Sequence, residues 1–193
     1  MQLVDAHCHL DDERLYGRLD AVLRDACGVG VVKLLTCAAS PEQWPVSAEM
    51  ARCHPEIAFA WGIHPWFVRP EHLAALGRLR EVREAGAKAI GEIGLDGKIE
   101  APSMAIQIDF FEAQLGIAKE LELPVVIHCR GAFNELLDSL RRIGTPPAGG
   151  MIHAFSGSVQ LARDFAKLGL KFSLGRSLTY KKSKKREELM QFI

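Results

Sequence analysis

The chain alternates short apolar runs with longer segments, and this alternation limits its possible folds more than any other feature. Seven runs are rich in β-branched residues and short enough to be strands. They lie at residues 3–4, 31–36, 57–63, 87–93, 125–128, 151–153 and 170–174. Two neighbouring parallel strands need a connection of roughly a dozen or more residues. All six segments between the runs are at least this long, so the pattern predicts parallel strands covered by helices in an α/β fold.

Two of the connecting segments carry clear helical signals. Apolar side chains recur at spacings of three or four from Ile106 to Leu121, and Pro124 ends that stretch. Ser158 is placed to cap the start of another helix, and Gly169 to end it. Each predicted helix connects two of the short runs, as a parallel sheet requires.

A barrel of eight strands and eight helices fits this order, but such barrels usually contain about 250 residues. The chain has 193 residues and seven strand-like runs. We therefore expect a TIM-type (β/α) barrel with about seven of eight strands present and the final strand missing, as a single domain over residues 1–193. Unpaired strand edges invite pairing with other chains, so we expect self-association to be possible through the two open barrel edges.

The charge balance, apolar content and cysteines of the chain exclude further classes of protein. Lys plus Arg and Asp plus Glu are 24 each, so any attraction to nucleic acid must come from a local site. No stretch approaches the roughly 18 uninterrupted apolar residues of a membrane span, and the N-terminus lacks a signal-peptide pattern. We expect a soluble, cytoplasmic protein with no membrane partner. The five cysteines include no CxxC pair, which indicates reduced thiols.

Metal-binding residue types occur at the ends of five predicted strands. His7 and His9 end the first run and are two residues apart, so their side chains point to the same face. The other four residues are His64, Glu92, His128 and His153. In parallel barrels the carboxyl ends of the strands form one rim, where active sites are built. Five of the seven histidines are therefore expected at one rim, whereas His54 and His72 are expected at the surface.

Imidazoles and a carboxylate are the ligands of a one- or two-metal hydrolytic site. We interpret Glu92 as the catalytic carboxylate that bridges two cations about 3.5–4 Å apart. The alternative is a rim carboxylate that pairs with Arg130 or a lysine. Gly91 and Gly94 remove side chains beside Glu92, which suits a tight turn or the close approach of a ligand.

Several other residues are candidates for substrate contacts. Phe155, Trp66 and Phe67 lie just beyond strand ends, where they could stack on a base or simply pack on the rim. Arg130 could clamp a phosphate or form a structural ion pair. Asp96 is expected to orient the loop that carries Glu92, and the alternative is a side chain that stabilises a turn. The basic run at residues 181–186 is interpreted as a solvated helix face rather than a DNA contact.

Five ordered motifs resemble those of the TatD-type metal-dependent deoxyribonucleases, which are amidohydrolase-like TIM barrels. The motifs are DAHCHLD at 5–11, GIHP at 62–65, GEIGLD at 91–96, PVVIHCR at 124–130 and HAFSGS at 153–158. The resemblance implies that His7, His9 and Glu92 hold one divalent metal ion. It also implies that Glu92, His128 and His153 hold a second, while His64 contacts the substrate phosphate.

The resemblance further implies DNA as the substrate, with a metal-activated water attacking a phosphodiester and with Zn, Mn or Mg as the two ions. Arg130 and Phe155 are then expected to bind substrate. Members of the family continue into a strand ending in Glu-Thr-Asp-x-Pro, which the printed sequence lacks, so we expect a C-terminally truncated member. Two alternatives remain open: a metallohydrolase of amides, esters or lactones, and a truncated, weakly active or inactive metal-binding barrel.

Overall fold

The computed structural model describes residues 1–175 and 184–192, which form one sheet of seven strands. The strands are β1 (Leu3–Cys8), β2 (Val31–Ala38), β3 (Ile57–Trp61), β4 (Ala89–Asp96), β5 (Val125–Arg130), β6 (Gly150–Ile152) and β7 (Leu170–Phe172). Their order in the sheet is their order in the chain, and each pairs in parallel with the next. This arrangement confirms the predicted TIM-type fold.

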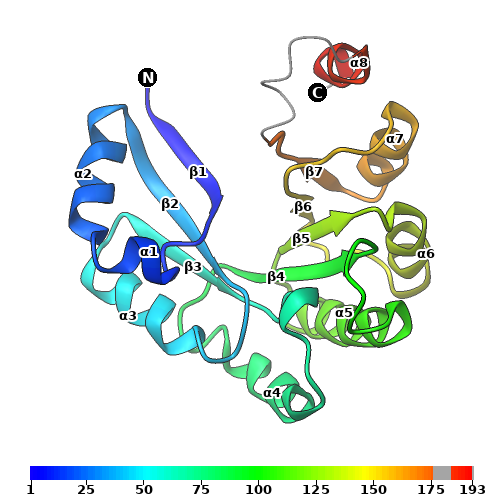
Figure 1. Ribbon diagram of the computed structural model, residues 1–193, viewed down its shortest axis with the longest axis horizontal. Coiled ribbons are helices and arrows are strands. Elements are labelled where there is room, and N and C mark those ends of the chain that lie inside the picture. The colour runs from blue at the N-terminus through cyan, green and yellow to red at the C-terminus, as the bar shows by residue number, and fades with distance from the viewer. Residues whose placement is uncertain (176–183, 193) are drawn as a thin grey trace.

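Helices α2 to α7 cover the outer side of the curled sheet, as Figure 1 shows. The α-helices are α1 (Glu13–Tyr16), α2 (Leu19–Gly28), α3 (Trp44–Cys53), α4 (Leu73–Arg78), α5 (Met104–Glu120), α6 (Phe133–Ile143), α7 (Val159–Lys167) and α8 (Lys184–Phe192). Three short 3₁₀ helices are η1 (Pro65–Phe67), η2 (Pro70–His72) and η3 (Leu79–Glu81). None of the helices in the described residues is long and apolar enough to cross a membrane.

The sheet has two open edges, which face each other across the gap at the top of Figure 1. Within residues 1–175 and 184–192, β1 and β7 each pair with a strand on one side only. On β1, Leu3 is 38% exposed and Val4 is 66% exposed. Self-association through these edges stays a prediction.

Local sequence signals are confirmed at both predicted helices. The Ile106–Leu121 pattern corresponds to α5, and the Ser158 hydroxyl caps α7 by accepting a hydrogen bond from the backbone N–H of Leu161 at 3.2 Å. Gly169 follows the end of α7 with a φ of 80°. Residues 181–183 of the basic run lie outside the described residues, and α8 begins after them.

The strand that carries Glu92 differs from its predicted bounds. It was expected at residues 87–93, but β4 begins at Ala89 and continues to Asp96, so Glu92 lies near its middle. Every residue of β4 is buried, which is typical of a central strand in a parallel sheet. The longer strand places Asp96, not Glu92, at the carboxyl end.

Small apolar side chains support the floor of the site. Cys37, Ala60, Ala89 and Val126 form one buried cluster, against which Met151 packs. Successive residues of a strand point to opposite faces, so Val126 shares a face with His128. The cluster therefore lies on the inner side of the sheet, beneath the histidines at the strand ends.

Candidate metal centre

The carboxylate of Glu92 is the centre of the site, and its side chain is almost fully buried. Its Oε2 atom lies 3.0 Å from Nε2 of His7 and 3.2 Å from Nε2 of His9. Its Oε1 atom lies 2.6 Å from Nε2 of His153 and 3.3 Å from Nδ1 of His128. The two oxygens thus face two different pairs of imidazoles, in the same division that the family resemblance implies.

The environment of Glu92 fits a metal ion better than an ion pair within the protein. Among the described residues, no lysine or arginine forms an ion pair with Glu92. Oε1 is buried and accepts no well-oriented hydrogen bond, although nitrogens of His153, His128 and His64 lie 2.6 to 3.6 Å away. A buried carboxylate oxygen without a partner is unfavourable. A cation shared with the nitrogens would satisfy it.

Two groups of potential ligand atoms are compact, with all atoms of a group within 4.8 Å of one another. One group is His7, Glu92 and His153, and the other is His64, Glu92 and His128. Both contain Glu92, which supports its predicted role as the shared ligand. These two groups differ from the pairs that face each oxygen of Glu92. His7 is grouped with His153, and His64 is grouped with His128.

The strand β2 fixes the orientation of His9. Its Nδ1 atom lies 2.8 Å from the backbone carbonyl of Cys37. A carbonyl oxygen only accepts hydrogen bonds, so Nδ1 carries the proton and donates it. In the neutral ring the lone pair is then on Nε2, which faces Glu92. Metal-binding histidines are commonly held by such a bond from the opposite nitrogen.

A buried aspartate holds His128 in the same way. Nε2 of His128 lies 3.1 Å from Oδ2 of Asp96, so it donates and leaves Nδ1 free to face Glu92. The same Oδ2 accepts a hydrogen bond from the indole of Trp66 at 2.7 Å, and Oδ1 accepts one from the backbone of Lys98 at 2.8 Å. Asp96 therefore orients a histidine, whereas it was expected to orient the loop that carries Glu92.

The hydrogen bonds of His64 distinguish it from the other four histidines. Its Nδ1 accepts a hydrogen bond from the backbone N–H of Trp66 at 3.1 Å. Burial lowers the pKa of His64 to about 3, so the ring is neutral and its proton is on Nε2. A protonated Nε2 donates hydrogen bonds and cannot ligate a metal. This geometry supports a substrate contact for His64, as the resemblance implies.

The charge states of Glu92 and His153 suit metal binding. Burial disfavours the charge of Glu92, but the imidazoles of His128 and His153, followed by those of His7 and His9, hold its pKa well below the usual range. Burial lowers the pKa of His153, and the carboxylate of Glu92 only partly offsets this effect. An ionised carboxylate and neutral imidazoles are the forms that bind metal ions.

Two glycines allow β5 to lie close against β4. A Cβ atom on Gly91 would lie 2.6 Å from Cβ of Val126. Gly94 has a φ of 145°, and a Cβ atom there would collide with the backbone oxygen of His128. The close approach predicted at these glycines is therefore that of a neighbouring strand, and it brings His128 to Glu92.

A cavity of about 810 Å³ opens over this group of residues. Its lining includes His9, His64, Glu92, His128 and His153. Trp66 and Phe67 of η1 also line it, and they are 48% and 40% exposed. A substrate in this cavity would contact both the histidines and an aromatic surface.

The sequence is similar to a known family over almost its whole length, since residues 4–193 match the family model described as TatD related DNase. The chain belongs to this family. It is 32% identical over 192 residues to YjjV of Escherichia coli (strain K12), which is named an uncharacterized metal-dependent hydrolase; the match covers 98% of this chain and 74% of YjjV. YabD of Bacillus subtilis (strain 168), which has the same description, is 31% identical, with coverage of 99% and 75%.

A solved structure supports the same assignment. The crystal structure of YjjV, described as a TatD homologue, aligns with a TM-score of 0.85 at 34% sequence identity. The alignment covers 92% of this chain and 70% of the YjjV chain. The fold of this TatD-related chain is thus that of a solved relative.

Two residues predicted to bind substrate lie outside the cavity of this TatD-related chain. Phe155 is fully buried, with its ring 5.2 Å from that of Phe133 and 4.9 Å from that of Phe172. Packing, the alternative considered for Phe155, is what the structure shows, because no face of the ring is open to a base. Arg130 is exposed at the end of β5 but is not among the residues that line the cavity.

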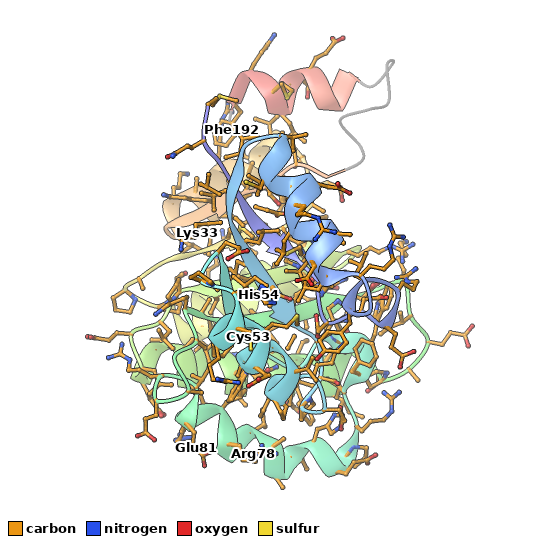
Figure 2. All side chains as sticks on the ribbon, turned by 90° about the vertical axis from the view of Figure 1, so that its left-hand side faces the viewer. Lys33, Cys53, His54, Arg78, Glu81 and Phe192 are labelled. Atoms are coloured by element: carbon orange, nitrogen blue, oxygen red, sulfur yellow. The ribbon has the colours of Figure 1, made fainter. Side chains whose placement is uncertain are left out.

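The two remaining histidines lie away from the centre, but both are only partly exposed, whereas a surface position was expected; the side chain of His72 is 12% exposed. Figure 2 shows His54 beside Cys53 at the end of α3, on the outer side of the molecule. Nε2 of His72 lies 3.3 Å from a carboxylate oxygen of Glu42. Neither residue belongs to the groups of potential metal ligands.

Two segments of the cavity lining were not predicted from the sequence. The lining also contains Asp12, Arg14, Leu15 and Arg18, which follow β1, together with Ala39 and Gln43, which follow β2. No motif marks these residues. Their position was a usable signal, because segments that directly follow barrel strands form the rim around the active site.

Proposed function

We propose that this chain is a metal-dependent phosphodiester hydrolase that acts on DNA. The observation that carries the proposal is the buried Glu92 carboxylate, whose two oxygens face separate pairs of imidazoles at 2.6 to 3.3 Å. This arrangement supports a site that holds two cations. The family description supports DNA as the substrate, and relatives are named metal-dependent hydrolases.

Each residue of the site has a distinct task in this proposal. His7 and His9 would hold one ion with Glu92, and His128 and His153 would hold the other. Divalent ions such as Zn, Mn or Mg supply Lewis acidity and lower the pKa of water when they are bound in such a site.

His64 and Asp96 act through protons at defined atoms. His64 presents an N–H at Nε2 toward the centre, where it would donate a hydrogen bond to a phosphate oxygen. Asp96 keeps the proton of His128 on Nε2, so that Nδ1 faces the metal position.

Metal titration followed by a nuclease assay tests the proposal. The metal-free chain is titrated with Mn²⁺, Zn²⁺ and Mg²⁺ by calorimetry, and release of nucleotides from a labelled single-stranded DNA is then measured. Glu92→Gln is the matched control, because it keeps the size of the side chain and removes its charge. We expect the parent to release nucleotides only with metal, and Glu92→Gln to lose metal binding while its circular dichroism is unchanged.

Two results would contradict the proposal. Metal-dependent cleavage of small amides, esters or lactones without nucleotide release would show a carbonyl hydrolase. Metal binding with no hydrolysis of either class would show a metal-binding barrel without this activity.

A further inference from the structure

The segment that follows β1 gives the cavity a positively charged region. It includes α1 and ends at the N-cap of α2, and besides His9 four of its residues line the cavity that contains Glu92. Among the lining residues in the described part of the chain, Arg14 and Arg18 are the only arginines, and there is no lysine. Both belong to this segment, although the metal-ligand residues come from several strands.

The two arginines differ in how their charge is balanced. Nε and a terminal nitrogen of Arg14 donate hydrogen bonds of 2.8 and 2.7 Å to the two carboxylate oxygens of Asp12. Arg14 lowers the pKa of Asp12 strongly, so this carboxylate stays ionised. The charge of Arg14 is therefore already paired within the cavity wall.

Arg18 has no such partner. It is exposed, and it forms no ion pair with any carboxylate in residues 1–175 and 184–192. A guanidinium presents planar N–H donors that match two oxygens of a phosphate. Its uncompensated charge makes Arg18 the side chain of the cavity wall best suited to hold an anion.

The aromatic side chains of the same cavity indicate which chemical group is attached to the bound anion. Trp66 and Phe67 are about half exposed, and the indole N–H of Trp66 is fixed to Asp96 at 2.7 Å. Fixed aromatic surfaces bind unpaired bases of any sequence by stacking. A metal centre, an unpaired guanidinium and a stacking surface in one cavity fit a chain of nucleotides better than a single phosphate ester.

We propose that Arg18 is a specificity residue that holds a second phosphate of a single-stranded oligonucleotide, next to the phosphate at the metal centre. This inference rests on the proposed function and adds that the site selects substrates with at least two consecutive phosphates. Trp66 and Phe67 stack on a base of the same substrate. Arg18 takes no part in the chemistry at the scissile phosphate.

Steady-state kinetics of Arg18→Gln on two substrates test the inference. One substrate is a single-stranded decathymidylate, and the other is bis(p-nitrophenyl) phosphate, which has a single phosphodiester. We expect Arg18→Gln to raise KM for the oligonucleotide roughly 3- to 10-fold, the range for one charged contact that remains partly in water. KM for the small diester should not change. The slope of log KM against log salt concentration should fall by about 0.7, as for one lost phosphate contact.

Arg24→Gln is the control for net charge. Arg24 is an exposed residue of α2, the helix that begins directly after Arg18, and it is not part of the cavity lining. It should leave both KM values and the salt slope unchanged. Arg18→Lys, which keeps the charge but not the planar fork, should recover part of the oligonucleotide KM.

Three results would overturn the inference: no change in oligonucleotide KM, an equal change for both substrates, or the same change in Arg24→Gln. Fluorescence anisotropy of the labelled decathymidylate separates this failure from failure of the proposed function. Weaker binding by Arg18→Gln without any cleavage by the parent would support the phosphate contact and contradict the hydrolase. Metal-dependent cleavage with unchanged binding by Arg18→Gln would support the hydrolase and contradict the phosphate contact.

Discussion

Substitution of Asp96 by Asn tests how the protein orients His128, a proposed metal ligand. Oδ2 of Asp96 accepts hydrogen bonds from His128 at 3.1 Å and Trp66 at 2.7 Å, and Oδ1 accepts one from the backbone of Lys98 at 2.8 Å. An Asn side chain has one oxygen and one donating NH₂ group. An NH₂ group in the place of Oδ2 would face the donors of His128 and Trp66, which is unfavourable. The amide should therefore place its oxygen toward these two donors and its NH₂ group toward Lys98.

The size of the effect follows from this orientation. His128 would keep an acceptor at Nε2 but lose the negative charge, and charge-assisted hydrogen bonds are roughly twice as strong as neutral ones. The backbone N–H of Lys98 would lose its partner, but Lys98 is exposed, so water can replace it. Loss of a residue that orients a metal ligand typically weakens metal binding about 10- to 100-fold. Because the acceptor remains, we expect about 10-fold, or about 1.4 kcal/mol.

Calorimetric titration with Mn²⁺ measures this change directly. Trp66→Phe is the matched control, since it removes the other donor to the same oxygen and leaves the bond between Asp96 and His128 intact. We expect its metal affinity to match that of the parent. Unchanged metal affinity in Asp96→Asn, with correct folding shown by circular dichroism, would refute the role of Asp96 and the assignment of His128 as a ligand.

Three further predictions concern single side chains. His64→Ala should keep the metal content measured by mass spectrometry and raise KM for DNA, whereas His128→Ala and His153→Ala should lower the metal content. Equal loss of metal in all three variants would contradict a substrate role for His64 that differs from the role of the two ligands. Phe155→Ala should lower the free energy of unfolding in urea by about 3–5 kcal/mol because it empties a buried site, and a raised KM at full stability would instead restore its substrate role. Iodoacetamide at pH 8 should label the exposed Cys27 and Cys53 in the folded protein. Burial raises the pKa of Cys8 and Cys129 to about 12, so these thiols stay protonated at that pH and should label only after unfolding; their labelling in the native state would contradict the structure.

The strands and main helices were predictable because their signals are local. Apolar runs and helical spacing need no knowledge of the partner strand, and Ser158 and Gly169 act within their own helix. The carboxyl end of β4 was harder to predict from the sequence. Gly94 and Asp96 are residue types typical of turns, but the structure keeps them in the strand because the backbone of β5 lies against Gly94.

The histidines of the site were predictable because strand ends in a parallel barrel converge at one rim. Their orienting partners were not. The contact of His9 with Cys37 and that of His128 with Asp96 depend on the register between neighbouring strands. A pattern within one strand does not contain that register.

Residues outside the strands were the least predictable. Phe155 and Trp66 both follow strand ends, yet Phe155 turns into the core and Trp66 lines the cavity. Arg18 has no motif that separates it from other surface arginines. In each case the direction of the side chain is set by tertiary packing, which spacing in the sequence does not reveal.

Anomalous X-ray diffraction from crystals grown with Mn²⁺ tests most directly whether two metal ions share Glu92. We predict two anomalous peaks about 3.5–4 Å apart. One should lie beside Oε2 with His7 and His9, and the other beside Oε1 with His128 and His153. A single peak would contradict the bridging role of Glu92, and no peak within coordination distance of Glu92 would contradict the metal centre itself.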